Sequence, residues 1–341
     1  MKKIWSAVTV VLLTAVSAVV IAYGSSVSER EIDTSGKQTY AWPLATCSTE
    51  ETITHVFAQT FAEEVGRLSA GKMEIQVDPQ STLGGDRELM ESCKDGDIPF
   101  VVQSPAPQVS FMPELCVFDT PCVFDDIEEA RAAIDNPEFF SVIQRIYEDA
   151  GYQILGMADQ CFRVMTSSEP FTGMESFKGQ KIRTMENTYH IQFWNAMGAN
   201  PTPMTFSEVY IGLQQGTIDA QENAYELIVS AKLYEQQEVL VKTNAVPDYI
   251  TLIVSDDFFQ DLDKKQQQIV REAAAIAQEK ARESADERRE QREEELAAEG
   301  MEIVEIDQQT WEEMQEACQP VYENIRKQAG DELVDLYMGV E

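Results

Sequence analysis

The sequence predicts an α/β protein of two lobes, each built on a mixed sheet with flanking helices. Its 341 residues suffice for two separate hydrophobic cores. A hydrophobic content of 43% is typical of a globular protein. Segments with the period of a strand alternate along the chain with segments that have the period of a helix. Together these three observations favour sheets covered by helices.

The first part of the chain has the order strand, helix, strand, helix, strand. The expected segments are a strand at 38–42, a helix between Ser48 and Gly71, a strand at 73–77, a helix at 86–93 and a strand at 98–102. This order argues for a mainly parallel sheet, in which ligands bind beyond the carboxyl ends of the strands. We therefore expect three segments at a cleft: the loop 44–48 with Thr46, the loop around 83–86 with Asp86, and Gln103-Ser104. For Asp86, a helix N-cap is an equally good interpretation.

Segment 179–225 places polar and aromatic residues where predicted elements begin or end. The elements are a strand at 181–183, a helix at 187–197, an extended stretch at 201–204, a helix that ends at Gly216 and a further helix opening at 219–223. Arg183, Phe206 and Asn223 are therefore expected where a ligand can reach them.

A strand at 161–167 precedes that segment, and its alternation turns Arg163 away from the face of Phe162 and Val164. In the helix at 187–197, Trp194 is expected in the core. His190 is expected on a solvated face, with an approach to the cleft as the alternative. Glu222 is expected to have a structural role, in which it holds loop amides.

The last part of the chain is mostly helical. An apolar strand at 249–254 is expected to return to the first lobe, and a single long helix follows at 262–298. Beyond residue 285 this helix is almost entirely charged, which is typical of a solvated face with opposite charges three or four residues apart. A strand at 301–306 and helices at 308–330 and 331–338 complete the chain.

Several motifs of segment 179–225 form a specific combination. They are Lys181-Ile182-Arg183, Gly198-Ala199-Asn200-Pro201-Thr202-Pro203-Met204, Phe206-Ser207-Glu208-Val209-Tyr210, Leu213-Gln214, Gly216, and Asp219 with Gln221-Glu222-Asn223. This combination resembles the solute-binding proteins of tripartite ATP-independent periplasmic (TRAP) transporters, of the DctP type. The resemblance extends from about Ala41 to the last helices. It implies a two-lobed periplasmic-binding-protein fold in which the long helix spans both lobes.

The resemblance also implies a division of the chain and a set of ligand contacts. The expected divisions are a signal peptide at 1–24, lobe I at 38–160 plus 250–288, and lobe II at 161–249 plus 289–341. Arg163 is expected to reach into the cleft, and the acidic Asp86 to face the ligand. A closed, loaded form would deliver its ligand to the small and large membrane subunits of a permease driven by an ion gradient.

Arginine chemistry supports a small organic acid as the ligand. A guanidinium group is planar and permanently charged, and it matches a carboxylate with two parallel hydrogen bonds. We expect Arg183 and Arg163 to bind such a carboxylate, although internal ion pairs are the alternative in a chain with 60 acidic residues. Phe206 is expected to give the site an apolar wall, or else to pack its own helix. Asn223 can donate to and accept from the ligand. A carboxylate, a dicarboxylate and a sugar acid all remain open.

Other classes of function are disfavoured by composition. A net charge of −34 argues against a nucleic-acid partner. The chain has two histidines, no glycine-rich phosphate loop and no His/Cys cluster with metal-ligand spacing, so we expect no enzyme, cofactor or metal. A Cys161–His190 nucleophile pair would lack an orienting third residue. A monomer is expected. A periplasmic ligand sensor for a signalling receptor is the alternative function.

The amino terminus predicts export. Lys2 and Lys3 precede an apolar run from 4 to about 22, which is typical of a signal peptide, and a retained anchor is the alternative. Export permits disulfides among the six cysteines. Cys116 and Cys122 are close enough in sequence to pair if the chain turns between them, but six cysteines allow 15 pairings. The family is usually poor in cysteine.

Overall fold

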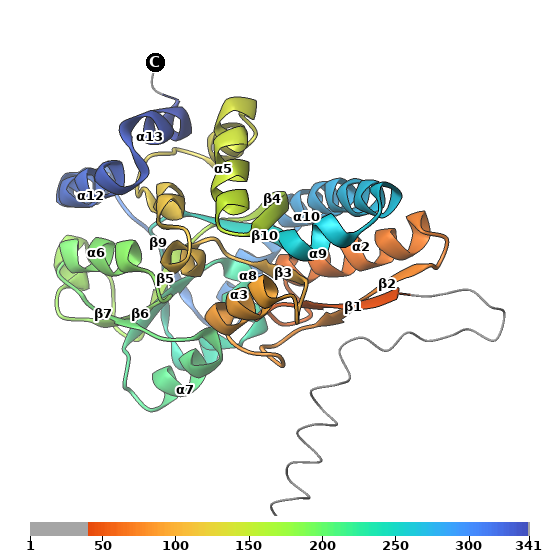
Figure 1. The fold of residues 1–341 in the computed structure, drawn as a ribbon. Helices are drawn as coiled ribbons and strands as arrows, with labels where there is room; N and C mark the ends of the chain where they lie inside the picture. Colours follow the sequence, from red (N-terminus) through yellow and green to blue (C-terminus); the bar gives the residue numbers. More distant parts are fainter. Residues whose placement is uncertain (1–39, 340–341) are drawn as a thin grey trace, which may run out of the picture.

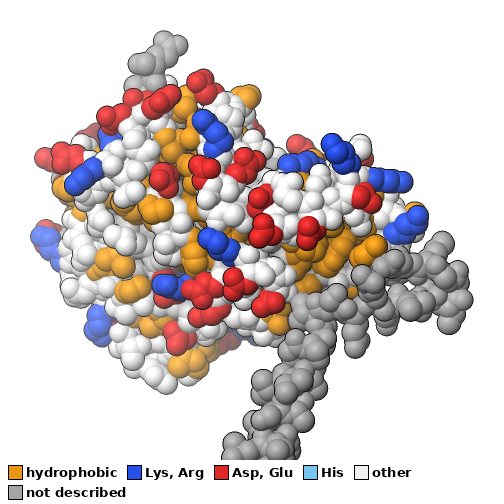
Figure 2. Space-filling view, in the orientation of Figure 1, with side chains coloured by type: hydrophobic (Ala, Val, Ile, Leu, Met, Phe, Trp, Pro, Cys, Tyr) orange, Lys and Arg blue, Asp and Glu red, His pale blue; other side chains and the backbone are white. Residues whose placement is uncertain are grey.

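The computed structural model describes residues 40–339, which form two sheets with helices on their faces (Figure 1). The predicted signal peptide at 1–24 lies outside the described residues. Within 40–339, no helix has the length and apolar character needed to cross a membrane. Acidic side chains are distributed over the face shown in Figure 2 rather than gathered in one patch.

The first sheet has five strands in the order β2-β1-β3-β10-β4. Its strands are β1 (Tyr40–Ala45), β2 (Met73–Asp78), β3 (Phe100–Gln103), β4 (Tyr152–Phe162) and β10 (Pro247–Ser255). Strand β1 pairs parallel with β2 and β3, whereas β10 is antiparallel to β3 and β4. The predicted parallel start is confirmed, and so is the return of segment 249–254 to this sheet.

Helices of the first half cover this sheet. They are α2 (Ile53–Leu68), α3 (Asp86–Asp95), α4 (Ile127–Ile134) and α5 (Pro137–Asp149), with 3-10 turns at Ala106–Ser110 and Pro113–Asp119; α9 (Asp256–Asp261) follows β10. Helix α2 begins at Thr52, whose side chain accepts a hydrogen bond from the backbone nitrogen of His55. The stripe of Phe57, Phe61 and Val65 on this helix is fully buried.

The second sheet has six strands in the order β11-β9-β5-β8-β6-β7. Its strands are β5 (Val164–Ser167), β6 (Lys181–Thr184), β7 (Asn200–Pro203), β8 (Ala220–Asn223), β9 (Val239–Lys242) and β11 (Glu302–Glu305). The prediction that 219–223 opens a helix is wrong. These residues form β8, which lies between β5 and β6, because pairing on both sides outweighs the low strand propensity of its polar residues.

The remaining helices lie around this second sheet, with two exceptions. They are α6 (Thr188–Ala196), α7 (Val209–Gln214), α8 (Tyr225–Ser230) and α11 (Gln308–Ala317), with 3-10 turns at Met174–Phe177, Phe206–Glu208 and Leu233–Gln236. The exceptions are α12 (Gln319–Ala329) and α13 (Asp331–Met338). Their buried residues, such as Ile325 and Tyr337, cluster with side chains of the first sheet. The residue ranges of the two lobes remain a prediction.

The long helix α10 (Lys264–Ala298) contacts both halves of the molecule, as predicted. Its first half carries small residues such as Ala274 and Ala277, which allow close packing against α2 and β4. Near its other end, Leu296 joins the apolar cluster of β5 and β9, and Glu293 pairs with Lys242 of β9 at 3.0 Å.

The chain passes between the sheets at two neighbouring places besides this helix. One is Arg163, between β4 and β5, and the other is the stretch 243–246, between β9 and β10. The backbone nitrogen of Arg163 donates to the carbonyl of Val246 at 2.9 Å, so the two crossings lie side by side. Beside them, Cys161 and Asn244 have left-handed φ values of 66° and 41°.

Candidate ligand-binding site

A small pocket lies between the two sheets, next to the crossings. Its volume is about 40 Å³, which is room for roughly two or three water molecules. The lining residues come from both halves of the molecule: Cys47, Ser48, Thr54, Asp86, Ser104, Gln160, Arg163, Arg183, Met185, Phe206, Asn223, Leu227, Asp248 and Ile250. Asp86, Ser104, Arg163, Arg183, Phe206 and Asn223, which the sequence placed at the site, are among them, and Thr46 is not.

Arg183 is buried in this pocket with part of its guanidinium unused. Strand β6 carries it beside Gln221 of β8 and Thr202 of β7. Its Nε and Nη2 donate to the carbonyl oxygen of Met204 at 2.9 and 2.6 Å. The residue is only 2% exposed, so its Nη1 is buried, yet this nitrogen has no hydrogen-bond partner. Burial lowers the pKa of Arg183 to about 10, which leaves the group charged at neutral pH.

Arg163 is held very differently, because protein acceptors surround its guanidinium. Its Nε and Nη2 pair with the carboxylate of Glu222, and its Nη1 pairs with Asp248 at 2.8 Å. Nη2 also donates to the carbonyl of Glu222 and to Oδ1 of Asn223 at 2.9 Å. The alternative of internal ion pairs thus describes the surroundings of Arg163, and its contact with a ligand remains a prediction.

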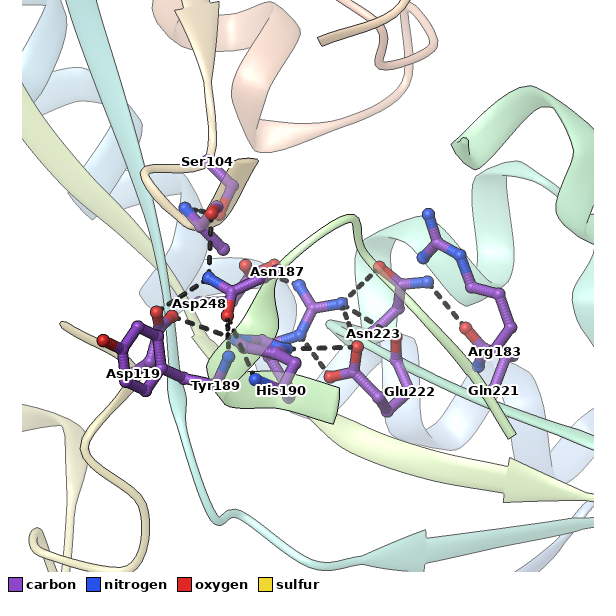
Figure 3. A network of polar contacts seen from close by, with 12 residues as sticks. Ser104, Asp119, Arg183, Asn187, Tyr189, His190, Gln221, Glu222, Asn223 and Asp248 are labelled. Carbon is purple, nitrogen blue, oxygen red and sulfur yellow. Dashed lines mark hydrogen bonds and ion pairs between the residues drawn. The ribbon is translucent and has the colours of Figure 1, made fainter. Parts of the chain in front are cut away.

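A chain of buried polar contacts extends from Glu222, the partner of Arg163, through His190 to Asp119 (Figure 3). Nδ1 of His190 lies 3.6 Å from Glu222, and its Nε2 lies 3.1 Å from Asp119. Asn187 caps helix α6 and donates to Asp119 at 2.7 Å. Burial lowers the pKa of His190, but the bonds to Asp119 and Glu222 outweigh it and raise the pKa to about 9. His190 is therefore charged at neutral pH and bridges two carboxylates.

The expectation that His190 lies on a solvated face is wrong, because this histidine is 4% exposed. From the sequence, Glu222 is expected to hold loop amides, but its carboxylate instead bonds to Arg163 and lies 3.6 Å from His190. Burial raises the pKa of Glu222, but Arg163 and His190 outweigh this effect and hold it at about 2. The sequence signal that could have located this cluster is weak: Asp119 and His190 are 71 residues apart, and only the fold brings them together.

Asp86 lies at the opening of α3, on the first-sheet side of the pocket. Gly85 occupies the N-cap position, so the helix-cap interpretation of Asp86 is wrong. Burial raises the pKa of Asp86, while the Cys47 thiol and the charge of Arg183 lower it in part. The pocket therefore holds a carboxyl group opposite its one incompletely bonded cation.

The other predicted residues have distinct surroundings. Phe206 is half-buried beside the pocket and also packs against the cluster of α7 and α8. Asn223 is buried, with its Nδ2 donating to Gln221 at 2.6 Å. Thr46 is buried behind the lining, where its Oγ1 accepts from the backbone nitrogen of Ser48 at 3.2 Å. Thr46 thus supports the loop that presents Ser48.

Three polar lining residues, Thr54, Gln160 and Asp248, were not identified from the sequence as site residues. Thr54 donates to Gln160 at 3.3 Å, and Gln160 donates to Asp248 at 3.3 Å. These contacts join α2, β4 and β10 in one row of polar groups beside Arg163. Thr54 is a polar residue among the apolar residues that α2 buries, just after its N-cap. This polar position in the buried face was the sequence signal that could have identified it.

A larger cavity, of about 570 Å³, lies on the far side of the crossings. Charged side chains of both signs line it, among them the exposed Asp126, Arg289 and Glu290. Exposed charges are hydrated and mobile, so this cavity is less well organised for a small anion than the pocket of Arg183. Within residues 40–339, no group of three potential metal ligands is found.

Comparison with known proteins finds a family model, a relative and solved structures that are all solute-binding proteins. Residues 44–328 match the family model "Bacterial extracellular solute-binding protein, family 7", DctP. The ectoine-binding periplasmic protein TeaA of Halomonas elongata is 33% identical over 244 residues, 69% of each chain. A sugar-acid-binding protein of Advenella mimigardefordensis, solved with galactonate, aligns with a TM-score of 0.85 and 27% identity, covering 89% of this chain and 97% of that one. A TRAP solute-binding protein of Polaromonas, solved with D-erythronate, gives 0.84 and 30%, over 88% and 99%.

Proposed function

Because the chain belongs to the bacterial extracellular solute-binding protein family 7, the non-enzymatic binding component of TRAP transport, we propose that it captures a small carboxylate through Arg183. The observation that carries this proposal is the unpartnered Nη1 of Arg183, a buried cationic donor on a residue that lines the pocket. A buried charged donor without an acceptor is costly, and an incoming carboxylate removes that cost.

The ligand has hydrogen-bond donors in addition to its carboxylate. Arg163 already has carboxylate partners, so within the pocket Arg183 is the cation with a free donor. A second carboxylate on the ligand would approach Asp86 and be repelled, whereas hydroxyl or N–H groups would donate to it. Galactonate, D-erythronate and ectoine, which the related proteins bind, all combine a carboxylate with such donors.

Binding requires the two sheets to separate. A pocket of about 40 Å³ is too small for a sugar acid or for ectoine. The crossings at Arg163 and 243–246 are the places where the chain can bend, and closure then surrounds the ion pair with protein instead of water. In this proposal the closed, loaded protein docks on TRAP permease subunits. A periplasmic sensor would use the same pocket, so ligand binding alone does not separate transport from sensing.

The proposal predicts that Arg183→Ala abolishes carboxylate binding. Charge-assisted hydrogen bonds contribute about 1.5–3 kcal/mol each, which corresponds to a loss of affinity of roughly 10- to 100-fold for each bond. Titration calorimetry with galactonate, D-erythronate, ectoine and succinate measures this loss. We expect at least one ligand with donors to bind more tightly than succinate.

The matched control is Arg145→Ala, which removes an exposed arginine on α5 whose Nε bonds only to the carbonyl of Ser141 within its own helix. It should bind like the wild type. Wild-type affinity in Arg183→Ala would refute the arginine contact. Preference for succinate over every ligand with donors would refute the role given to Asp86. Uptake of the best ligand in cells that lack the gene then separates transport from sensing.

A further inference from the structure

Two of the six cysteines lie together in one apolar cluster. Cys122 follows the 3-10 turn that ends at Asp119, and Cys318 lies between α11 and α12. They are 196 residues apart in the sequence, yet both belong to the same apolar cluster and are at most 3% exposed, and the Cys318 thiol raises the pKa of the Cys122 thiol. The same cluster contains Met314 and Ala245. Proximity and burial make these two thiols candidates for a covalent bond.

The surrounding hydrogen bonds fix the backbone of this pair. Nε2 of Gln315 donates to the carbonyl of Cys122 at 3.0 Å, and the hydroxyl of Tyr322 donates to the carbonyl of Pro121. Gln315, Cys318 and Tyr322 lie at positions i, i+3 and i+7, which share one face of consecutive helical turns. The loop of Cys122 is thus held against the face that presents Cys318.

A third contact restrains the loop from its other side. The backbone nitrogen of Cys122 donates to the carbonyl of Ala245 at 2.6 Å, within the crossing between β9 and β10. Cys122 itself has a left-handed φ of 56°, a conformation that needs support from its surroundings when the residue is not glycine. Restraint on both sides limits the separation of the two thiols in the folded protein.

The other cysteines are placed differently. The thiol of Cys116 lies 4.0 Å from the carbonyl of Ile325, in the cluster of the first sheet, so a Cys116–Cys122 bond is not favoured. The Cys93 thiol donates to the carbonyl of Pro99 at 3.5 Å, and the Cys47 thiol to that of Gly84 at 3.6 Å. Cys122 and Cys318, by contrast, share one apolar cluster.

We propose that Cys122 and Cys318 form a disulfide when the protein folds outside the cytoplasm. Two S–H bonds break and one S–S bond forms; two protons are released, and two electrons reduce the disulfide of an oxidant to two thiols. The oxidant is a dithiol-disulfide oxidoreductase or a small-molecule disulfide, classes that operate in oxidising compartments. Burial makes folded thiols inert, so oxidation accompanies folding. The proposal depends on export and not on the identity of the ligand.

The disulfide would also support the polar network next to the ligand pocket. Asp119 is three residues before Cys122 and holds both His190 and Asn187. His190 in turn contacts Glu222, the partner of Arg163. A covalent bond at Cys122 therefore anchors the end of this network that is farthest from Asn223.

The test is to count thiols in protein purified from the periplasm of an expression host. The sample is denatured without reductant, alkylated with iodoacetamide and digested for mass spectrometry. We expect four alkylated cysteines and one cross-linked pair of peptides that contain Cys122 and Cys318. After reduction all six should be alkylated. Six alkylated cysteines before reduction, or a cross-link that includes Cys116, would overturn the proposal.

Variants test its energetic consequence. Reductant should lower the thermal midpoint of the wild type by roughly 5–10 °C, because the bond closes a long loop. Cys122→Ala/Cys318→Ala should match the reduced wild type and not respond to reductant. The matched control, Cys116→Ala, should keep the cross-link and the response. A double variant that still responds to reductant would contradict the assignment. Calorimetric ligand binding on the same samples reports separately on the proposed function.

Discussion

Arg163, in the crossing between β4 and β5, and Arg183, on β6, have opposite surroundings. Arg163 has five protein acceptor atoms around its guanidinium, contributed by Glu222, Asp248 and Asn223. Arg183 has the carbonyl of Met204 and a free Nη1. We infer that Arg163 positions Asn223 and the crossings, whereas Arg183 binds the ligand. Both need arginine rather than lysine, because a fork of several donors is required to hold its partners in place.

At this scale His190 makes stability depend on pH. Its pKa is raised from 6.5 to about 9 by Asp119 and Glu222, which outweigh the opposing effect of burial. The folded protein therefore binds a proton more tightly than the unfolded chain. The resulting stabilisation is complete below pH 6.5 and is lost as pH rises through about 9. Urea denaturation between these pH values should show falling stability in the wild type.

His190→Gln provides the control, since glutamine keeps hydrogen-bonding groups but does not titrate in this range. The variant should be less stable at pH 6.5 and should lose less stability as the pH rises. His55, whose pKa is lowered chiefly by burial, is present in both proteins and cancels in the difference. Parallel curves for the two proteins would show that His190 is not charged in the folded state.

At the scale of the elements, the packing of α10 on β4 requires a small residue at the contact. Gly156 of β4 lies under this helix, where a Cβ atom would be 3.0 Å from Oε1 of Gln278 and 3.3 Å from Cζ of Phe57. That same Oε1 accepts from the backbone nitrogen of Met157 at 2.8 Å, so it is not free to move. Gly156→Ala should therefore destabilise the protein by about 1–3 kcal/mol, the usual cost of overpacking.

Gly66→Ala is the matched control for this substitution. Gly66 lies in α2, and a Cβ atom there would have the carbonyl of Met73 at 3.9 Å as its nearest neighbour. Alanine in a helix interior is favoured over glycine by about 0.5–1 kcal/mol, so this variant should be as stable as the wild type or more stable. Urea unfolding of both variants measures the difference. Equal stability of the two would show that α10 packs more loosely on β4 than this structure indicates.

For the whole molecule, the net charge makes stability depend on salt concentration. With a net charge of −34, the excess negative side chains repel one another in any compact state. The pocket nevertheless keeps a local positive field from Arg183. The Debye length falls from about 30 Å at 0.01 M salt to about 3 Å at 1 M, so added salt should weaken this repulsion. We expect the thermal midpoint to rise by several degrees when NaCl is increased over this range.

The Arg183→Ala variant separates general screening from chloride binding. If screening is the cause, the variant should show the same rise as the wild type. A rise confined to the wild type would instead show chloride at the free Nη1. A midpoint that falls with salt in both proteins would mean that ion pairs such as Arg282–Asp135, at 2.7 Å, stabilise the fold more than self-repulsion destabilises it.

Much of the fold follows from local patterns along the chain. The apolar stripe of α2, the alternation in β2 and the length of α10 each depend on neighbours within one element, so periodicity predicted them. The motif around Arg183 likewise predicted the family, because its residues are close in sequence. The polar strand β8 was missed, since only its two partner strands make it a strand.

The sequence by itself determined the two-lobed α/β class, the family and the pocket location of Arg183, Asp86 and Asn223. Tertiary structure alone decided which arginine has free donors, that His190 is a buried bridge, and that Cys122 lies against Cys318 rather than Cys116. The physical reason is that burial and ion pairing depend on residues far apart in the chain. Asp119 and Glu222, for example, reach His190 from 71 and 32 positions away, and no local pattern encodes that meeting.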